Sequence, residues 1–301
     1  MELFDIFVQN IVPIFIVAGI GFLIVRYLGA DVQTLSRVTL YVLTPCLLFD
    51  VLVNSNVSAD EFERLTLFAL GTILGIGLMA WLVTRALRLD RVMTSAFIVV
   101  VMFCNGGNYG LPLTLFVFGQ DALARATIYF VTSIVLTYTV GIFLASGGRR
   151  SMGEALLIVL RIPSIYASAA AIVVILIGVE TPSFLMRPIK LLGDAAIPVM
   201  ILVLGMQLER AVKPAGLRLV ALAVGLRLVV SALLGLLLAQ FIGLSGTARQ
   251  AGVLQSAMPV AVVTTILAVE FEVEPAFVTS VVFMSTILSP LTLTPLIALL
   301  K

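Results

Sequence analysis

The sequence predicts an all-α polytopic membrane protein. Of its 301 residues, 61% are hydrophobic and only 11% are charged, and the mean hydropathy is +1.21. A water-exposed domain of this length does not tolerate such a composition on its surface. The apolar residues are spread along the whole chain in runs of about 20, each long enough to cross a hydrocarbon core of about 30 Å. No stretch has the composition of a separate soluble domain.

Polar residues divide the apolar runs into ten expected transmembrane helices. The first run is longer than the core of a signal peptide and lacks both a basic segment before it and a cleavage site after it, so we expect it to be retained. The first to tenth helices are expected at residues 5–28, 35–53, 62–86, 92–118, 122–145, 155–179, 184–208, 217–242, 248–270 and 275–300.

Recurring prolines divide the chain into two similar halves. The members of three pairs lie 150, 153 and 147 positions apart: Pro13 and Pro163, Pro45 and Pro198, Pro112 and Pro259. Each pair falls in equivalent helices, the first with the sixth, the second with the seventh and the fourth with the ninth. Five helices per half would insert the halves with opposite orientation, as in many secondary transporters. We therefore expect residues 1–150 and 151–301 to be inverted repeats; chance spacing of the prolines is the alternative.

Basic residues in the connections predict the orientation, because cytoplasmic loops carry an excess of Lys and Arg. When alternate connections are counted as one side, ten basic residues fall on one side and six, including Lys301, on the other. The side with ten is predicted to face the cytoplasm. Both termini belong to the opposite side, so we expect them on the outer face.

Several classes of function are disfavoured by composition. A net charge of +2 is too small to indicate nucleic-acid binding, and the absence of histidine excludes histidine-ligated zinc and histidine proton relays. Cys46 and Cys104 lie inside apolar runs, where we expect small hydrophobes rather than a disulfide or metal ligands. No paired catalytic carboxylates, activated nucleophile or Walker-type loop is recognisable, so we expect neither an enzyme nor an ATP-driven pump, and no metal or cofactor.

The fourth expected helix contains a break at residues 104–112. This stretch holds three glycines, two asparagines and Pro112. Glycine costs roughly 1 kcal/mol and proline about 3 kcal/mol in a helix interior, and proline frees a carbonyl that lipid cannot satisfy. Such backbone is tolerated at membrane depth where it is buried in protein or lines a wet cavity. A binding site is therefore favoured over a simple kink filled by neighbouring helices.

The equivalent stretch of the ninth helix, residues 255–265, has one proline with polar residues on both sides. If both helices break at mid-depth and cross, their half-helices bring two N-terminal and two C-terminal ends to one place. The N-terminal N–H groups could receive a carboxylate, while freed carbonyls and the amides of Asn105, Asn108 and Gln255 could hold a cation or the ligand. An anion site could thus exist without a buried arginine.

Other polar residues could line the same cavity or take part in ion coupling. Thr44 and Pro45 mark an expected kink that faces the centre. Ser133 and Thr137 share one face of the fifth helix, although such hydroxyls also bond to their own backbone. Thr264 follows the second break. Arg227 lies near the middle of the eighth helix, where a charge is a functional hypothesis by default. The coupling ion could be a proton or sodium.

At this point the chain resembles the auxin efflux carrier family over essentially its whole length. The resemblance rests on the Asn105-Gly106-Gly107-Asn108-Tyr109-Gly110-Leu111-Pro112 stretch, on Thr44-Pro45 and on the break at Pro259. It implies that the fourth and ninth helices cross. It also implies two arms of the substrate site, one with Asn105, Gly107, Asn108, Tyr109 and Pro112, the other with Gln255, Ser256, Met258, Pro259 and Val260.

The resemblance also implies an architecture and an activity. The first, second, sixth and seventh helices would form a scaffold, through which the protein would form a homodimer, and the other six a core that moves like an elevator. Plant members export indole-3-acetate, bacterial members include proposed malonate and malate carriers, and the bile-acid/sodium symporters are related. The chain lacks the long central loop of plant members and is similar to compact bacterial ones, so we expect a protein of the bacterial inner membrane.

The sequence therefore predicts a secondary transporter that moves a small organic anion, such as a mono- or dicarboxylate or an auxin-like acid, by alternating access. Two alternatives remain open. One is a sodium-coupled symporter of larger amphipathic anions. The other is a membrane receptor that binds a ligand without moving it, against which the scarcity of soluble loops argues.

Overall fold

The computed structural model describes residues 2–147, 152–209 and 216–301. Within these ranges the chain is 86% helical and forms no strand, which confirms the predicted all-α class. Among the described residues, seven helices are long and apolar enough to cross a membrane: Leu3–Leu28, Val32–Val53, Ala59–Ala86, Gly106–Ala145, Ser183–Leu208, Leu217–Ile242 and Pro275–Leu300. The other expected helices are shorter or interrupted, and the count of ten stays a prediction.

The elements of the first half follow the expected helices, with π-helical turns, labelled η, inside several of them. In chain order they are α1 (Glu2–Ile6), η1 (Phe7–Ile11), α2 (Val12–Leu28), α3 (Val32–Val38), η2 (Thr39–Leu43), α4 (Thr44–Val53), α5 (Ala59–Ala86), α6 (Arg91–Met102), η3 (Gly106–Gly110), α7 (Leu111–Leu136), η4 (Thr137–Gly141) and α8 (Ile142–Ala145). Gly119 interrupts α7 with φ 79° and ψ −169°, a conformation that favours glycine, and so separates the fourth and fifth expected helices.

The second half continues with α9 (Met152–Val159), α10 (Pro163–Ile177), α11 (Ser183–Leu208), α12 (Leu217–Gly225), η5 (Leu226–Val230), α13 (Ser231–Ile242), α14 (Gly246–Ser256), α15 (Val263–Glu270) and α16 (Pro275–Leu300). The sixth helix, expected to be continuous over residues 155–179, is instead interrupted before Pro163. A residue that precedes proline is disfavoured in the helical region, and Ile162 is accordingly extended at φ −93° and ψ 111°.

The prolines of the first half are accommodated by the same local structure. Pro13, Pro45 and Pro112 each occupy the second position of an α-helix that directly follows a π-helical turn. Proline offers no N–H and its ring clashes with the carbonyl four residues earlier. A wider turn just before the proline separates these groups, so the chain continues without a full break.

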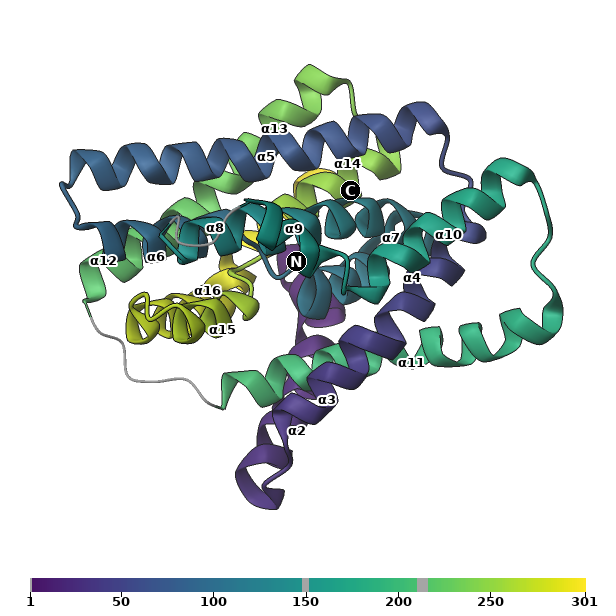
Figure 1. The fold of residues 1–301 in the computed structure, drawn as a ribbon, viewed down its shortest axis with the longest axis horizontal. Coiled ribbons are helices and arrows are strands. Elements are labelled where there is room, and N and C mark those ends of the chain that lie inside the picture. Colours follow the sequence, from purple (N-terminus) through teal and green to yellow (C-terminus); the bar gives the residue numbers. More distant parts are fainter. Residues whose placement is uncertain (1, 148–151, 210–215) are drawn as a thin grey trace.

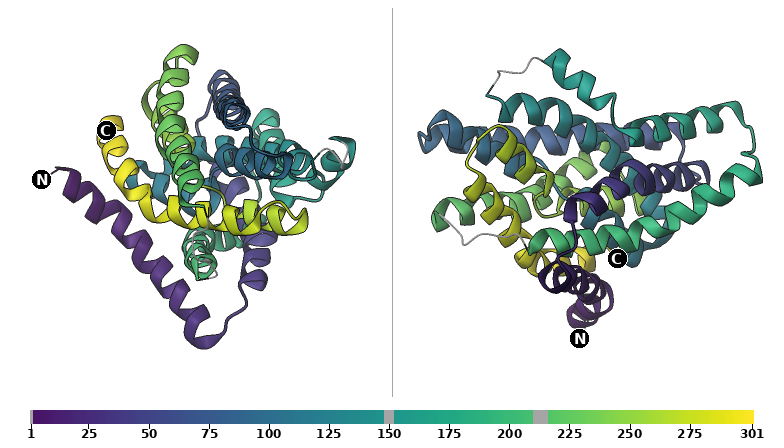
Figure 2. Two further views of the ribbon diagram at one scale, coloured as in Figure 1. Left: turned by 90° about the vertical axis from the view of Figure 1, so that its left-hand side faces the viewer. Right: turned by 60° about the horizontal axis from the view of Figure 1, so that its bottom comes forward.

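The two ends of the chain lie close together in all views (Figures 1 and 2), and α1 packs against α16. This placement agrees with both termini being on one side, whereas the side itself stays a prediction. Four of the basic residues that were counted to predict the orientation lie outside the described residues, namely Arg149, Arg150, Arg210 and Lys213. The proposed boundary of the halves at residue 150 lies outside them too, and the division into repeats stays a prediction.

The helices expected to form a scaffold do pack together. Helix α2 lies against α11, and α4 lies against both α10 and α11. Figure 1 shows α2, α3 and α11 on one side of the molecule and α5 and α13 on the other. The contact of α2 with α11 is backbone on backbone, since a Cβ at Gly205 would lie 1.7 Å from the carbonyl oxygen of Ala18. Small residues permit such close crossings in membrane proteins.

Gly21, on the α2 side of this contact, provides a test. In Gly21→Ala the new methyl carbon would lie 2.1 Å from the carbonyl oxygen of Leu202, so the two helix backbones would have to separate. Overpacking of this kind costs about 1–3 kcal/mol. We expect a lower melting temperature of the purified protein in detergent. Gly19→Ala, on the same helix with no atom within 4 Å, is the matched control and should melt like the wild type. Equal melting of both variants would contradict the contact.

Candidate substrate site at the helix crossing

The breaks of the fourth and ninth helices cross and pair through their backbones. The N–H of Asn105 donates to the carbonyl of Pro259 at 2.7 Å, and the N–H of Ala261 donates to the carbonyl of Phe103 at 3.0 Å. Cys104 thereby faces Val260 in an antiparallel bridge. Buried backbone groups must find partners, and each break satisfies groups that the other has freed. The predicted crossing is confirmed.

The first break is a tight turn that opens a new helix. Asn105 has φ −78° and ψ 62°, and the N–H of Gly106 donates to the carbonyl of Cys104 at 2.9 Å, which is the geometry of an inverse γ-turn. The first N–H groups of a helix have no partner within it. Those of Gly107, Asn108 and Tyr109 have none elsewhere in the described chain either. The turn therefore presents free donors at the N-terminal end of η3.

Glycines at the break make room for two side chains. A Cβ at Gly106 or at Gly110 would lie 2.8 or 2.5 Å from Oε1 of Gln255, and a Cβ at Gly107 would lie 2.8 Å from the ring of Phe130. Real side chains are not found this close. The glycine-rich sequence is thus needed for packing at the crossing, in addition to ending a helix.

A cavity of about 170 Å³ adjoins the crossing. It lies between elements of the predicted scaffold and elements of the predicted core. Its walls come from α3 to α4, the first break, α7 with η4, α11 and the second break: Ser36, Thr39, Leu40, Thr44, Cys104, Asn105, Gly106, Gly107, Asn108, Phe130, Ser133, Ile134, Thr137, Tyr138, Met200, Val203, Gln207, Ala261, Val262, Val263 and Ile266. No charged side chain of the described residues lines it.

Six of the candidate residues lie on this wall, namely Thr44, Asn105, Gly107, Asn108, Ser133 and Thr137. Tyr109 and Pro112 of the first arm point elsewhere and are buried. The hydroxyl of Tyr109 accepts a hydrogen bond from Ser289 at 3.2 Å, and its ring meets Phe15 edge-on. Pro45 also lies away from the cavity wall.

The predicted second arm is buried behind the cavity. Gln255, Ser256, Met258 and Val260 are fully buried, and the carbonyl of Pro259 is used in the backbone pairing. The N–H of Val260 donates to the hydroxyl of Ser285 at 3.1 Å. Thr264 donates to the carbonyl of Ala261 at 2.6 Å. In the described conformation these residues shape the crossing, and the adjoining residues 261–263 supply the wall.

Gln207 and Phe130 are among the wall residues that the sequence reasoning missed. Gln207 on α11 accepts a hydrogen bond from Nδ2 of Asn108 at 3.4 Å, which links the first break to the scaffold. Its place near the end of an expected helix made it look like an ordinary boundary residue. Phe130 looked like any lipid-facing or core aromatic. A polar residue inside the seventh helix was the only available signal for Gln207.

Three buried polar atoms at the crossing lack hydrogen-bond partners in the described chain. They are Nδ2 of Asn105, Oε1 of Gln255 and Nε of Arg227. Nε2 of Gln255 donates to Thr114 at 3.5 Å, whereas Asn105, only 6% exposed, borders the cavity. Buried polar groups are normally paired, so each exception calls for an explanation. An unpaired amide donor beside a helix N-terminus is suited to an anion.

Comparison with known proteins agrees with this geometry. Residues 6–154 and residues 149–297 both match the family described as membrane transport protein, which is the auxin efflux carrier family. The chain belongs to this family. It is 28% identical over 290 residues to an uncharacterized transporter of Methanothermobacter thermautotrophicus, covering 93% of this chain and 94% of that one. It is 26% identical over 269 residues to an uncharacterized transporter of Methanocaldococcus jannaschii, covering 85% and 86%. The family match and these relatives support the conclusion that the chain is a multi-pass membrane transport protein.

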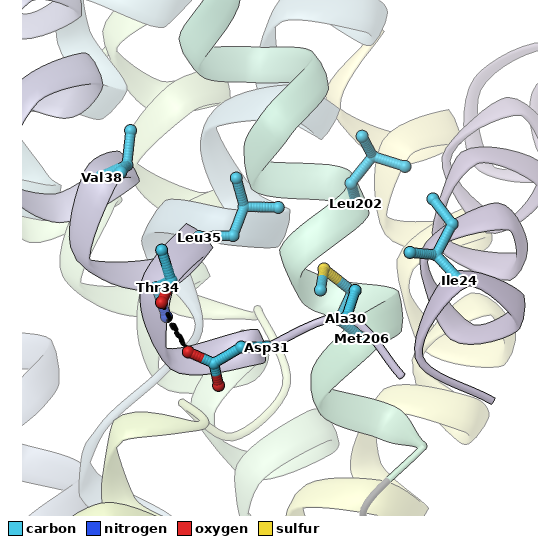
Figure 3. Close-up of a pocket in the computed structure, with 8 residues that line it drawn as sticks. All are labelled: Ile24, Ala30, Asp31, Thr34, Leu35, Val38, Leu202 and Met206. Atoms are coloured by element: carbon cyan, nitrogen blue, oxygen red, sulfur yellow. Dashed lines mark hydrogen bonds between the residues drawn. The ribbon is translucent and has the colours of Figure 1, made fainter. Parts of the chain in front are cut away.

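A second hollow on this transport protein lacks the chemistry of an anion site. It lies between the end of α2, the start of α3 and α11 (Figure 3) and is mainly apolar. Its one charged lining residue is Asp31, whose carboxylate caps α3 by accepting the N–H groups of Gln33 and Thr34 at 3.2 and 3.0 Å. A carboxylate would repel an anionic ligand. The cavity at the crossing is therefore the better candidate.

Cys104 can report on this cavity, because it lies on the wall whereas Cys46 does not. In a Cys46→Ala background, a small methanethiosulfonate reagent should modify Cys104 in the folded protein. Phe130→Trp should narrow the cavity and slow the reaction, which mass spectrometry can follow. The Cys46→Ala/Cys104→Ala protein controls for modification at other residues. Modification of Cys104 only after unfolding would contradict an accessible cavity.

Proposed function

We propose that the protein is a secondary transporter of a small organic anion whose carboxylate binds at the N-terminal end of η3. The observation that carries the proposal is the set of unpaired donors at the cavity. These are the N–H groups of Gly107 and Asn108 and the amide of Asn105, and no carboxylate of the described residues lines the cavity to repel the ligand. A helix N-terminus carries about half a positive charge and is a common anion site.

The remaining wall suits the other end of such a ligand. Phe130, Met200, Val203 and Ile266 are apolar and come from helices on both sides of the cavity. Pockets that combine a few convergent polar groups with an apolar wall are typical of small-molecule sites. The preferred substrate is then an asymmetric anion with one carboxylate and an apolar remainder, such as a monocarboxylate or an auxin-like acid.

Alternating access would move the core past the scaffold. The cavity is bordered by α3 to α4 and α11 on one side and by the first break, α7 and the second break on the other. A ligand bound to the break would travel with the core, and the hydrogen bond of Asn108 to Gln207 would break as it moves. A homodimer through scaffold helices and an outward placement of both termini complete the proposal.

Uptake by proteoliposomes tests the transport proposal. Carboxylates of graded size, each isotopically labelled, would be offered to liposomes that contain the full chain, with protein-free liposomes as the blank. We expect flux of at least one small carboxylate and none of matched amines. The absence of flux for every anion, with folded protein, would refute transport. Protection of Cys104 by a carboxylate without flux would favour the receptor instead.

Asn105→Ala and Asn108→Ala should each lower flux at limiting substrate by about tenfold or more. Hydrogen bonds to a charged group contribute about 1.5–3 kcal/mol, and 1.4 kcal/mol corresponds to a factor of ten. Asn54→Ala is the matched control, because Asn54 is exposed at the end of α4 and its side-chain amide donates to the carbonyl and the carboxylate of Asp50. Unchanged kinetics in an asparagine variant that folds normally would remove that residue from the site.

A further inference from the structure

Arg227 is the largest fully buried side chain of the described residues. It lies on the π-helical turn η5 in the middle of the eighth helix and is 1% exposed. No ion pair joins it to a carboxylate anywhere in the described chain. A buried charge is costly unless nearby groups compensate it. An arginine buried in mid-helix is neither a topology signal in a loop nor a side chain that reaches the membrane surface.

The guanidinium instead contacts the ends of two helices. Nη1 donates to the carbonyls of Val101 and Met102 at 3.0 and 3.4 Å, and these are the last two residues of α6. Nη2 donates to the carbonyl of Ser256, the last residue of α14. Ser231, one turn after Arg227, accepts from Nη2 at 2.7 Å and donates to the same Ser256 carbonyl at 2.7 Å. One side chain thus binds both half-helices where they enter the crossing.

The charges of these groups match. Each helix C-terminus carries roughly half a negative charge, so the C-terminal ends of α6 and α14 together present about one negative charge. The guanidinium supplies one positive charge. Close approach is built into the chain, because a Cβ at Gly235 on α13 would lie 2.2 Å from Oγ of Ser256. The helix that carries Arg227 is therefore held directly against the second break.

The same contacts engage the carbonyl oxygens of the first break. The five successive carbonyls of residues 101–105 all accept protein donors: Val101 and Met102 from Arg227, Phe103 from Ala261, Cys104 from Gly106 and Asn105 from Gly110. Breaks of this kind can coordinate a coupling cation through freed carbonyls and C-terminal helix ends. At this crossing a guanidinium occupies those ends.

We propose that Arg227 is a positioning residue that acts as a resident cation of the crossing. Its charge holds the C-terminal ends of α6 and α14 together, so that the opposite, N-terminal end of η3 stays directed at the cavity. A metal cation is then not required at this place. For transport, the inference rests on the proposed function, since the positioned end is the one that would receive the anion.

Three variants separate charge from hydrogen bonding. Arg227→Lys keeps the charge, Arg227→Gln keeps a donor without charge, and Arg227→Met keeps only the length. For the purified full chain in detergent, we expect the Lys variant to have the melting temperature closest to that of the wild type. The melting temperatures of the Gln and Met variants should be lower by on the order of 10 °C. Arg218→Gln, an exposed arginine at the start of α12, is the control and should melt like the wild type. Equal melting of the Gln and Lys variants would overturn the role of charge.

Cys104 gives a local readout at the crossing that needs no substrate. In the Cys46→Ala background, its rate of modification should be altered severalfold by Arg227→Gln and Arg227→Met and largely restored in Arg227→Lys. With Arg227 present, the rate should be the same in sodium, potassium and choline chloride at equal ionic strength. A rate that changes selectively with sodium would overturn the inference, because it would indicate a metal ion bound beside the guanidinium.

Flux measured in the same three salts separates this inference from the transport proposal. Equal flux in all three salts supports both the resident-cation role of Arg227 and the transport proposal. Flux that requires sodium would overturn the resident-cation role and leave transport standing. No flux of any anion, together with the expected order of melting and Cys104 modification, would refute transport and leave the positioning role of Arg227 standing.

Discussion

Two backbone hydrogen bonds allow two helices to stop inside the protein. The pairing of residues 103–105 with residues 259–261 satisfies groups that lipid could not. Both breaks depend on it, because neither has enough partners of its own. The pairing also places the C-terminal and the N-terminal helix ends at different locations. The C-terminal ends of α6 and α14 meet at Arg227, whereas the N-terminal end of η3 meets the cavity. An electropositive end is therefore left free for a ligand while the electronegative ends are neutralised within the protein.

Glycine has two different physical roles around this crossing. Gly106, Gly107 and Gly110 leave space for Gln255 and Phe130, so the break can be packed from both sides. Gly21 and Gly205 bring the backbones of α2 and α11 into direct contact. The first set shapes the candidate site, and the second allows two helices to pack closely beside it. The hydrogen bond from Asn108 to Gln207 joins these two regions. The cavity lies between α11, α3 and α4 on one side and the broken helices on the other.

Much of the architecture could be predicted because membranes restrict the backbone so strongly. Apolar runs predicted the helices, and the cluster of glycine and asparagine before Pro112 predicted a break, since a continuous helix there would be unfavourable. The break before Pro163 was not predicted, because Pro13, its proposed counterpart, is accommodated by a π-helical turn and nothing local distinguishes the two. Of the predicted second arm, Gln255 to Val260 proved to be buried behind the cavity. Their orientation depends on how α14 packs against α7 and α13, which periodicity does not encode.

The sequence by itself determined the fold class, the positions of both breaks and the family, because composition, proline and glycine act locally on each segment. Tertiary structure alone decided which polar groups face the cavity and what Arg227 does. Its partners lie 126 positions away at Val101 and 29 positions away at Ser256. A charge in mid-helix could have been a coupling site, a topology signal or a counter-charge. Only the meeting of two helix C-termini around it distinguishes these roles, since the partial charge of a helix end acts within its last turn and depends on where that end lies.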